Sequence, residues 1–332
     1  MTSAPDARLR LYRLMFGHIL TACVYVVAKL RIVDAADSDG LLRVDEVAAA
    51  KGLHADALYR VLRTLAGEGL FAEEPARTFA LTEAGGLLRD GDVSSRYMAL
   101  LQGSWLPLFV HLEDSVRTGL PISLVREGRT RWEALADDPE QSEIFNRAMR
   151  GRAAGLVRAL LRVDWSAAET IVDVGGGLGG TLLPLLAAQP HLRGILFDLE
   201  HVAEEARAAV ASAGLDDRCT VESGSFFERV PAGGDVYVLS NVLHDWYDED
   251  ARRIIQTCRA AAAPGSRLVV VESLVAAGDE QDWAKTLDIL MLAAVGGRER
   301  TEEEYRTLLA DAGFEVEQVV GDGPVALEAS PL

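Results

Sequence analysis

Five glycines stand close together in the middle of the chain, within residues 175–180. They directly follow the apolar run Thr170–Val174 and precede Thr181–Ala188, a segment with the pattern of a helix. Glycine lets a backbone turn sharply and approach a ligand closely, because it carries no side chain. Sheets of parallel strands bind ligands beyond the carboxyl ends of their strands. The cluster therefore predicts a cofactor-binding loop between a strand and a helix.

The spacing of this loop is compatible with two cofactors. Gly175, Gly177 and Gly180 fit G-x-G-x-x-G, the spacing of loops that bind dinucleotides. Gly175, Gly177 and Gly179 fit G-x-G-x-G, the spacing of loops that hold S-adenosylmethionine (SAM) in class I methyltransferases. Asp198, at the end of the next apolar run, could accept hydrogen bonds from the ribose of either cofactor. The loop alone leaves a nicotinamide dehydrogenase and a methyltransferase open.

His244 is the residue best placed to move a proton. It lies just beyond the apolar run Asp235–Leu239, where a side chain would face the cleft beside the glycine loop. Free imidazole has a pKa of about 6.5, which suits a general base. A phenol is a poor nucleophile while it is protonated, so a base that removes its proton would activate it. A carboxylate beside the second ring nitrogen would fix the tautomer. We expect the other histidines to be structural.

Six segments extend this pattern along the chain, and they are DVGGGLGG, FDLE, GSFFE, LSNVLHDW, RLVVVES and GGRERTEEEYRTLLADAGF. In this order and spacing they resemble the small-molecule O-methyltransferases of bacteria and plants, the family of the caffeic acid, acetylserotonin and hydroxyneurine enzymes. The resemblance covers essentially the whole chain. It implies an α/β fold, in which a doubly wound, Rossmann-like SAM domain follows an N-terminal helical, winged-helix-like dimerisation domain. It also implies a homodimer and a small aromatic acceptor.

The resemblance assigns a catalytic role to three residues. It makes His244 the general base and makes Glu272 and Glu299 the carboxylates that orient it. The less favoured alternatives from the residues alone are a solvated carboxylate at a strand end for Glu272 and a partner in a surface ion pair for Glu299. Asp245 and Trp246 are expected to be structural.

The residues that the resemblance assigns to SAM follow the ends of neighbouring strands, and they are Gly175, Gly177, Asp198, Ser225, Phe226 and Ser240. Asp198 would bind the ribose, and Ser225 and Phe226 would flank the adenine. The family usually has an aspartate where this chain has Ser225, so one charged acceptor for the adenine amino group is replaced by a hydroxyl. Serine at position 240 resembles the bacterial polyketide-tailoring branch, which also contains members that bind SAM without transferring methyl.

Four further residues are candidates for contact with the acceptor. The resemblance places Phe145, Asn146 and Met149 on a helix that helps to wall the substrate pocket. Asp288 is a polar residue within the otherwise apolar segment 286–292. It could face the pocket or form a local hydrogen bond, and the sequence favours neither.

The elements that must position these residues alternate between strands and helices. Strands are expected at Thr170–Val174, Arg193–Asp198, Cys219–Glu222, Asp235–Leu239 and Arg267–Glu272, with helices at Thr181–Ala188, Val202–Ala213, Asp248–Ala263 and Thr301–Ala312. This alternation predicts a doubly wound parallel sheet. Two further strands, Phe314–Val320 and Val325–Ala329, are expected to form a closing hairpin.

The N-terminal part has a different pattern. Helices are expected at Val44–Ala50 and Ala55–Gly67, followed by a hairpin of Leu70–Ala72 and Thr78–Leu81. This order is typical of a winged helix, which binds DNA in many proteins. The chain carries 33 basic and 51 acidic residues, a net charge of −18, and such a charge repels nucleic acid phosphates. We therefore favour a packing domain that binds no nucleic acid.

Two longer helices are expected between these regions, at Ser104–Thr118 and Pro139–Leu161. The chain then divides into a dimerisation domain at 1–103, pocket helices at 104–165 and a catalytic domain at 166–332. The apolar run Ile19–Ala28 is too short to span a bilayer and suits a buried or subunit-packing helix. With no signal peptide evident, we expect a cytoplasmic homodimer that does not bind membranes.

No metal site is expected. The cysteines Cys23, Cys219 and Cys258 are scattered and include no C-x-x-C pair, which argues against both zinc and a disulfide framework. Methyl transfer from a sulfonium needs proximity and a base, because its leaving group is already activated.

These observations favour a SAM-dependent O-methyltransferase. Its expected acceptor is a hydroxyl, with a phenolic one favoured, on a small aromatic or polyketide-type natural product. The alternatives are a SAM-binding relative diverted to decarboxylation, hydroxylation or cyclisation, and an N- or C-methyltransferase. The acidic net charge argues against a winged-helix regulator. The segments LHDW and GGRERT argue against a dehydrogenase.

Overall fold

The computed structural model describes residues 7–91 and 95–332. The chain forms two compact units. The first contains the residues up to Val110 together with Asp138–Gly151, and the second contains His111–Asp137 and Arg152–Leu332. The three-part division of the sequence analysis stays a prediction.

The first unit combines helices with a small antiparallel sheet. Its elements are α1 (Ala7–Lys29), β1 (Leu41–Arg43), α2 (Val44–Lys51), α3 (Ala55–Ala66), β2 (Phe71–Glu74), β3 (Thr78–Leu81), α4 (Glu83–Gly86) and α5 (Arg96–Phe109). The expected hairpin is present, and β1 adds a third strand that pairs with β3 through Leu42 and Phe79. Strand β1 was not predicted, because three residues are too few to show an alternating pattern.

The amphipathic pattern of α3 is confirmed. Leu58, Leu62 and Leu65 are buried on one face of α3, within a core that also contains Phe71 and Phe79. This burial of an apolar helix face against the sheet stabilises the first unit, because each fully buried side chain of this size contributes about 1.5–3 kcal/mol.

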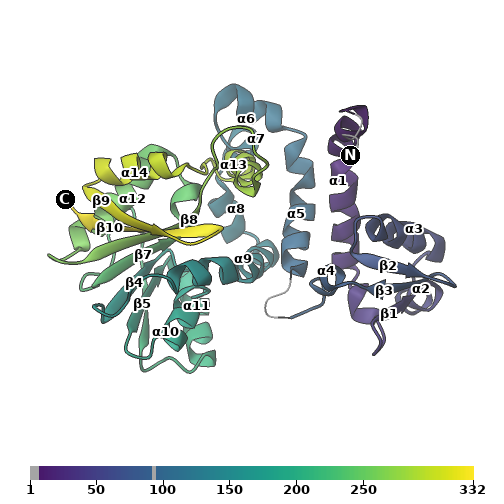
Figure 1. Ribbon diagram of the computed structural model, residues 1–332, viewed down its shortest axis with the longest axis horizontal. Coiled ribbons are helices and arrows are strands. Elements are labelled where there is room, and N and C mark those ends of the chain that lie inside the picture. The colour runs from purple at the N-terminus through teal and green to yellow at the C-terminus, as the bar shows by residue number, and fades with distance from the viewer. Residues whose placement is uncertain (1–6, 92–94) are drawn as a thin grey trace, which may run out of the picture. The chain divides into compact units, whose positions relative to one another are not determined.

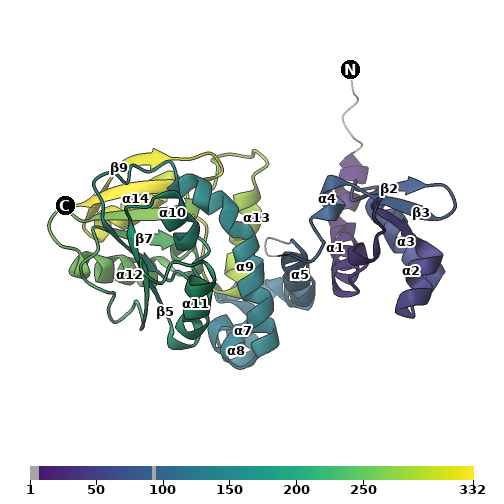
Figure 2. The ribbon, with the colours of Figure 1, turned by 90° about the horizontal axis from the view of Figure 1, so that it is seen from below.

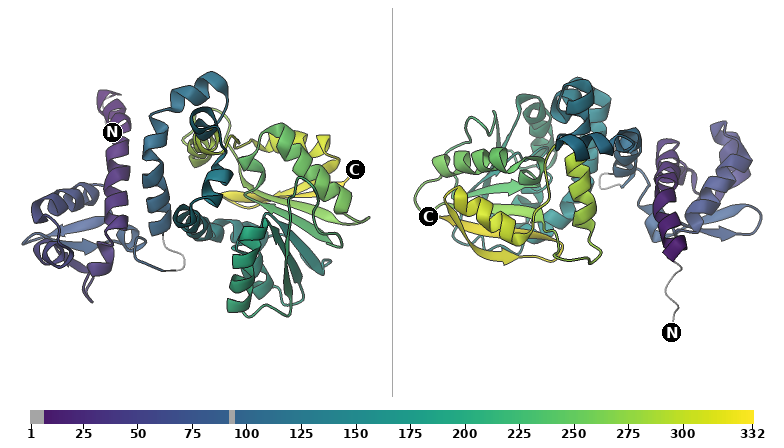
Figure 3. Two further views of the ribbon diagram at one scale, coloured as in Figure 1. Left: turned by 180° about the vertical axis from the view of Figure 1, so that it is seen from behind. Right: turned by 90° about the horizontal axis from the view of Figure 1, so that it is seen from above.

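The long helix α1 packs beside α5 within the first unit (Figure 3). A Cβ atom on Gly103 of α5 would lie 2.1 Å from the ring of Tyr25, so only glycine allows this approach. Helix α1 is longer than the apolar run predicted. Among the described helices it alone is long and apolar enough to cross a membrane by length and composition, and 11% of its apolar window is buried. One such helix is weak evidence for a membrane span, because core helices of soluble proteins and signal sequences pass the same test.

The expected helix Ser104–Thr118 is wrong as a single element. The structure has α5, which ends at Phe109, and a separate helix α6 (Leu112–Thr118). Pro107 lies inside α5 and lacks the amide proton that would extend the helical hydrogen bonding. The helix α9 (Pro139–Leu160) agrees with its prediction to within one residue.

The second unit is built on a seven-stranded sheet in the order β6-β5-β4-β7-β8-β10-β9 (Figure 1). Its strands are β4 (Thr170–Val174), β5 (Arg193–Asp198), β6 (Cys219–Ser223), β7 (Val236–Ser240), β8 (Arg267–Ser273), β9 (Phe314–Val320) and β10 (Pro324–Pro331). Strands β4 to β8 are parallel, and the β9–β10 hairpin joins β8 antiparallel. The predicted parallel sheet and closing hairpin are therefore confirmed.

Helices cover both faces of this sheet (Figures 1 and 2). The helices of this unit are α7 (Ile122–Glu127), α8 (Arg131–Ala136), α10 (Leu182–Ala188), α11 (Glu200–Ser212), η2 (Leu243–Asp245), α12 (Asp248–Ala261), α13 (Trp283–Ala294) and α14 (Glu302–Asp311), besides α6 and the end of α9. Those packed on the sheet are α10, α11, α12, α14 and the end of α9. Apolar side chains of α12 and α14 form one core with the sheet, and those of α10, α11 and the end of α9 form the other.

The strand order places the functional loops. The chain runs outward from β4 to β6 and then returns to the other side of β4 with β7. The carboxyl ends of β4 and β7 therefore meet at the point where the order reverses, which is where doubly wound sheets bind ligands. The glycine loop follows β4, and η2 with His244 follows β7.

Candidate active site

The glycine loop has a backbone that side chains would not allow. Gly175, Gly177 and Gly179 have φ angles of 72°, 57° and 78°, in the left-handed region that favours glycine. A Cβ atom on Gly175 would lie 3.0 Å from a methyl group of Val242 and 3.4 Å from the ring of Phe226. The structure thus brings Phe226, predicted to flank the adenine, directly beside the loop.

Asp198 ties the end of β5 to this loop. Its Oδ2 accepts a hydrogen bond of 2.8 Å from the Gly177 amide, and its Oδ1 accepts one of 2.7 Å from the Leu199 amide. Burial raises the pKa of Asp198, and these two amides oppose the shift. Each carboxylate oxygen can accept more than one hydrogen bond, so Asp198 keeps capacity for a ribose diol. Its role as a ribose ligand stays a prediction.

A second carboxyl group, Asp173, lies beneath the loop and was not predicted as a functional residue. It is 1% exposed, and burial raises its pKa to about 7. The Thr181 hydroxyl donates to its Oδ2 at 3.3 Å, while its Oδ1 has no partner among the described residues. A Cβ atom on Gly176 would lie 2.7 Å from Oδ2. An acidic residue inside an apolar strand was the sequence signal for this position.

The remaining predicted cofactor residues lie at the ends of β6 and β7. The Ser225 hydroxyl accepts from the Phe227 amide at 3.3 Å. The rings of Phe226 and Trp246 meet edge to face, with 5.9 Å between their centroids. The Ser240 hydroxyl is buried and has no partner within the described part of the chain, which marks a place where a polar ligand would satisfy it.

The predicted catalytic residues are brought together by the structure. His244 is 5% exposed, Glu299 2% and Glu272 fully buried. The His244 Nδ1 lies 3.0 Å from Glu299 Oε1 and 3.4 Å from Glu272 Oε2. Glu272 also accepts, through Oε1, from the amides of Leu243 at 2.9 Å and His244 at 3.3 Å. Neither carboxylate is therefore a solvated surface group, and both hold one side of the His244 ring.

The charges of this cluster are strongly coupled. Burial lowers the pKa of His244, but the negative charges of Glu272, Asp245 and Glu299 raise it more, to about 10. Burial raises the pKa of Asp245 to about 6 and that of Glu272 to about 7, and the His244 charge opposes both shifts. The cluster alone therefore favours the imidazolium form of His244, and a nearby cation would favour the neutral form.

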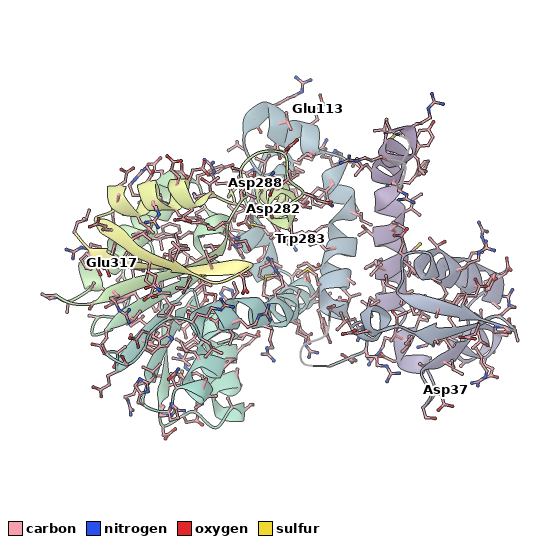
Figure 4. All side chains as sticks on the ribbon, viewed as in Figure 1. Asp37, Glu113, Asp282, Trp283, Asp288 and Glu317 are labelled. Atoms are coloured by element: carbon pink, nitrogen blue, oxygen red, sulfur yellow. The ribbon has the colours of Figure 1, made fainter. Side chains whose placement is uncertain are left out.

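Asp288 lies on α13 (Figure 4) and forms a local hydrogen bond. Its Oδ1 accepts from the Glu299 amide at 2.9 Å, so Asp288 helps to fix the residue that holds His244. Its contact with an acceptor stays a prediction. Phe145, Asn146 and Met149 lie on the part of α9 that belongs to the first unit, so their part in the pocket also stays a prediction.

His244, Glu272 and Glu299 each offer one atom that lies within 4.8 Å of the other two, a grouping that could also hold an ion. The distances to Nδ1 are those of hydrogen bonds and ion pairs. The expectation of a metal-free site therefore stays a prediction.

Arg300 was missed as a functional candidate, although it belongs to the GGRERT segment. It is 1% exposed and contacts the backbone on both sides of His244. The sequence signal was an arginine one residue from a predicted catalytic glutamate.

Two family models match this chain. The family model of an O-methyltransferase domain matches residues 109–315, and that of an O-methyltransferase dimerisation domain matches residues 12–90. The chain is 38% identical to the phenazine O-methyltransferase PhzM of Lysobacter antibioticus, covering 97% of this chain and 96% of that protein. It is also 39% identical to the aclacinomycin 10-hydroxylase RdmB of Streptomyces purpurascens, over 73% of this chain and 67% of that protein.

A solved structure with bound ligands is similar throughout. The O-methyltransferase NcsB1 of neocarzinostatin biosynthesis, in complex with SAM and 2-hydroxy-5-methyl naphthoic acid, has a TM-score of 0.79 and 36% identity, covering 94% of this chain and 96% of that one. The resemblance identified from the sequence is confirmed. The chain therefore belongs to the O-methyltransferase family and carries that family's dimerisation domain.

Proposed function

We propose that the protein transfers a methyl group from SAM to a phenolic hydroxyl of a small aromatic natural product, with His244 as the general base. It is a SAM-dependent O-methyltransferase by family. The buried His244 carries the proposal: Glu299 and Glu272 hold its Nδ1, and Nε2, which lies 3.5 Å from Asp245 Oδ1, is the nitrogen that would take the proton.

The residues around the glycine loop fit SAM. Asp198 offers carboxylate oxygens to a ribose, Phe226 offers an aromatic face beside the loop, and the Ser240 hydroxyl lacks a partner within the described residues. SAM supplies a methyl group on a sulfonium whose bonding electrons return to sulfur during transfer. NcsB1, which is similar over nearly the whole chain, binds SAM.

The proton of the acceptor has a defined destination. His244 Nε2 takes it from the hydroxyl, while an oxygen lone pair forms the new bond to the methyl carbon. Glu299 accepts from Nδ1 throughout and stabilises the resulting imidazolium. A positioned general base of this kind contributes typically 10²–10⁴-fold to the rate.

Cofactor binding also prepares the base. With a pKa of about 10, His244 holds a proton at neutral pH in the absence of other charges. A sulfonium near Ser240 adds a positive charge beside the cluster, and like charges disfavour the imidazolium. SAM is therefore expected to lower the His244 pKa. Imidazole NMR titrations with and without SAM would show a downward shift, and an unchanged pKa would contradict this coupling.

The acceptor class is tested by mass spectrometry after incubation with SAM and a panel of phenols, aromatic amines and polyketide-type aromatics. We expect a gain of one methyl group on a phenol, with one S-adenosylhomocysteine formed per product. The similarity to a 10-hydroxylase makes diverted chemistry the second candidate. A product that gains oxygen or loses carbon dioxide without a methyl group would favour it, and methylated amines would favour N-methylation.

We also propose that the protein is a cytoplasmic homodimer joined through the first unit. The matched dimerisation domain includes most of α1. Apolar side chains on α1 are exposed, and they are Leu9, Leu11, Tyr12, Leu14, Met15, Phe16 and Ile19. A contiguous exposed patch of this kind marks an interaction surface. Light scattering should show a dimer, and a stable monomer of 35.8 kDa at micromolar concentration would contradict it.

A further inference from the structure

Arg300 is a buried charge whose hydrogen bonds converge on the turn that carries His244. Its Nη1 donates to the Leu243 carbonyl at 2.9 Å, and its Nη2 donates to the Trp246 carbonyl at 2.9 Å. Its Nε and Nη2 also donate to one oxygen of Asp248, at 3.0 and 2.7 Å. A guanidinium can hold these acceptors together because its donors lie in one rigid plane.

Glu272 binds the amide groups of the same turn. One of its carboxylate oxygens accepts from the amides of Leu243 and His244. The turn is thus fixed by a carboxylate at its amide groups and by a guanidinium at its carbonyl groups. Hydrogen bonds to charged groups are stronger than neutral ones, so both contacts resist rotation of the His244 backbone.

The segment before Arg300 lies directly against the same turn. The Arg298 amide donates to the His244 carbonyl at 2.9 Å. A Cβ atom on Gly297 would lie 2.0 Å from that carbonyl oxygen, so this backbone approach requires glycine. Glu299, between these residues, holds the His244 ring. One short segment therefore fixes both the backbone and the imidazole of the proposed base.

We infer that Arg300 is a positioning residue for methyl transfer: by binding the carbonyls of Leu243 and Trp246, it sets the place and direction of the His244 ring. This inference rests on the proposed role of His244 as base. A misplacement of about 1 Å can lower the rate about 10²-fold. Loss of Arg300 should therefore lower kcat and leave SAM binding intact, because Gly175 and Asp198 follow β4 and β5 and not the turn after β7.

The charge of Arg300 has a second effect on the cluster. Three carboxylates face His244, from β8, from the segment after α13 and from η2. Arg152 acts on one of them, Asp245, and Arg300 is the cation bonded to the turn itself, where it is also paired with Asp248. Removing the Arg300 charge favours the imidazolium, because one repelling cation is lost. The acidic limb of the pH–rate profile should then move to higher pH. A purely structural role would lower thermal stability without moving this limb.

The test compares Arg300→Met, Arg300→Lys and a control, Arg267→Met. Arg267 makes similar bonds far from the turn, to the Glu328 carboxylate at 2.8 Å and the Asp164 carbonyl at 2.8 Å. The measurements are kcat, KM for the acceptor, SAM affinity by calorimetry, melting temperature and the pH–rate profile. His244→Gln is measured in the same assay.

We expect Arg300→Met to lower kcat roughly 10–100-fold, to keep SAM affinity and to shift the acidic limb upward. Arg300→Lys keeps the positive charge, so its acidic limb should lie at the wild-type pH. Its kcat should stay low, because one ammonium cannot bind both carbonyls and Asp248. Arg267→Met should change only the melting temperature. Wild-type kcat and an unmoved limb in Arg300→Met would overturn the inference.

If Arg300→Met does not fold, wild-type kcat in Arg300→Lys overturns the inference, and a lowered kcat with unchanged SAM affinity supports it. The proposed base is judged separately. Full transfer by His244→Gln contradicts the base itself, whereas an inactive His244→Gln beside a fully active Arg300→Met contradicts only the positioning role.

Discussion

Replacing Asp173 with asparagine is expected to stabilise the second unit at alkaline pH. Asp173 is almost fully buried, and burial raises its pKa from 3.8 to about 7. A group with a raised pKa in the folded state contributes stability that is complete below pH 3.8 and is lost as the pH rises through about 7. One pKa unit corresponds to about 1.4 kcal/mol. Above pH 8 the ionised Asp173 therefore lowers the free energy of unfolding by about 4 kcal/mol.

Asparagine removes this charge but adds buried amide hydrogens that need acceptors. Its amide can still accept from the Thr181 hydroxyl, as Asp173 Oδ2 does. Its amide hydrogens replace Oδ1, an atom without a partner among the described residues, and an unsatisfied buried donor costs about 1–3 kcal/mol. At pH 8 the net stabilisation should be about 1–3 kcal/mol, which for a unit of this size is about 2–4 °C in melting temperature per kcal/mol.

The assay follows the unfolding of both proteins between pH 5 and pH 8. The stability of Asp173→Asn relative to wild type should rise by about 3 kcal/mol over this range. The exposed Asp216→Asn controls for the loss of one carboxylate. SAM should reduce the difference, because its positive charges stabilise the Asp173 carboxylate. A difference that does not change with pH would refute the reasoning.

Three further predictions concern the site. Asp198→Ala should weaken SAM binding about 10- to 150-fold, because a hydrogen bond to a charged group is worth about 1.5–3 kcal/mol; equal calorimetric affinities would contradict the assignment. Gly297→Ala should lower kcat about 100-fold, since its Cβ would overlap the His244 carbonyl, whereas Gly86→Ala, in open space, should not. A chelator should leave turnover unchanged, and activity lost to it and restored by a divalent cation would show a metal site.

Much of the second unit could be predicted because its strands are apolar and bounded by glycine or charged residues. The limits of β4, β5 and β9 agree with the sequence to the residue. The first unit was less predictable. The strand β1 is too short for a pattern, and the division of Ser104–Thr118 into two helices has no glycine to mark it.

The proximity of His244, Glu272 and Glu299 was expected from the family resemblance, since they lie on three segments that are far apart in the sequence. Their burial and the resulting rise in the His244 pKa depend on packing that spacing does not encode. Arg300 escaped prediction for the same reason. A surface arginine and a buried one are identical in sequence, and only the carbonyls that converge on it distinguish them.

The most direct test of the central claim is methyl transfer by His244→Gln to an acceptor whose own pKa is well above 8. Such an acceptor does not ionise by itself at working pH, so it needs the base. We expect turnover to fall roughly 10²–10⁴-fold, with SAM affinity retained and the acidic limb of the pH–rate profile absent. Full methyl transfer by this variant would contradict the account and leave proximity alone to explain catalysis.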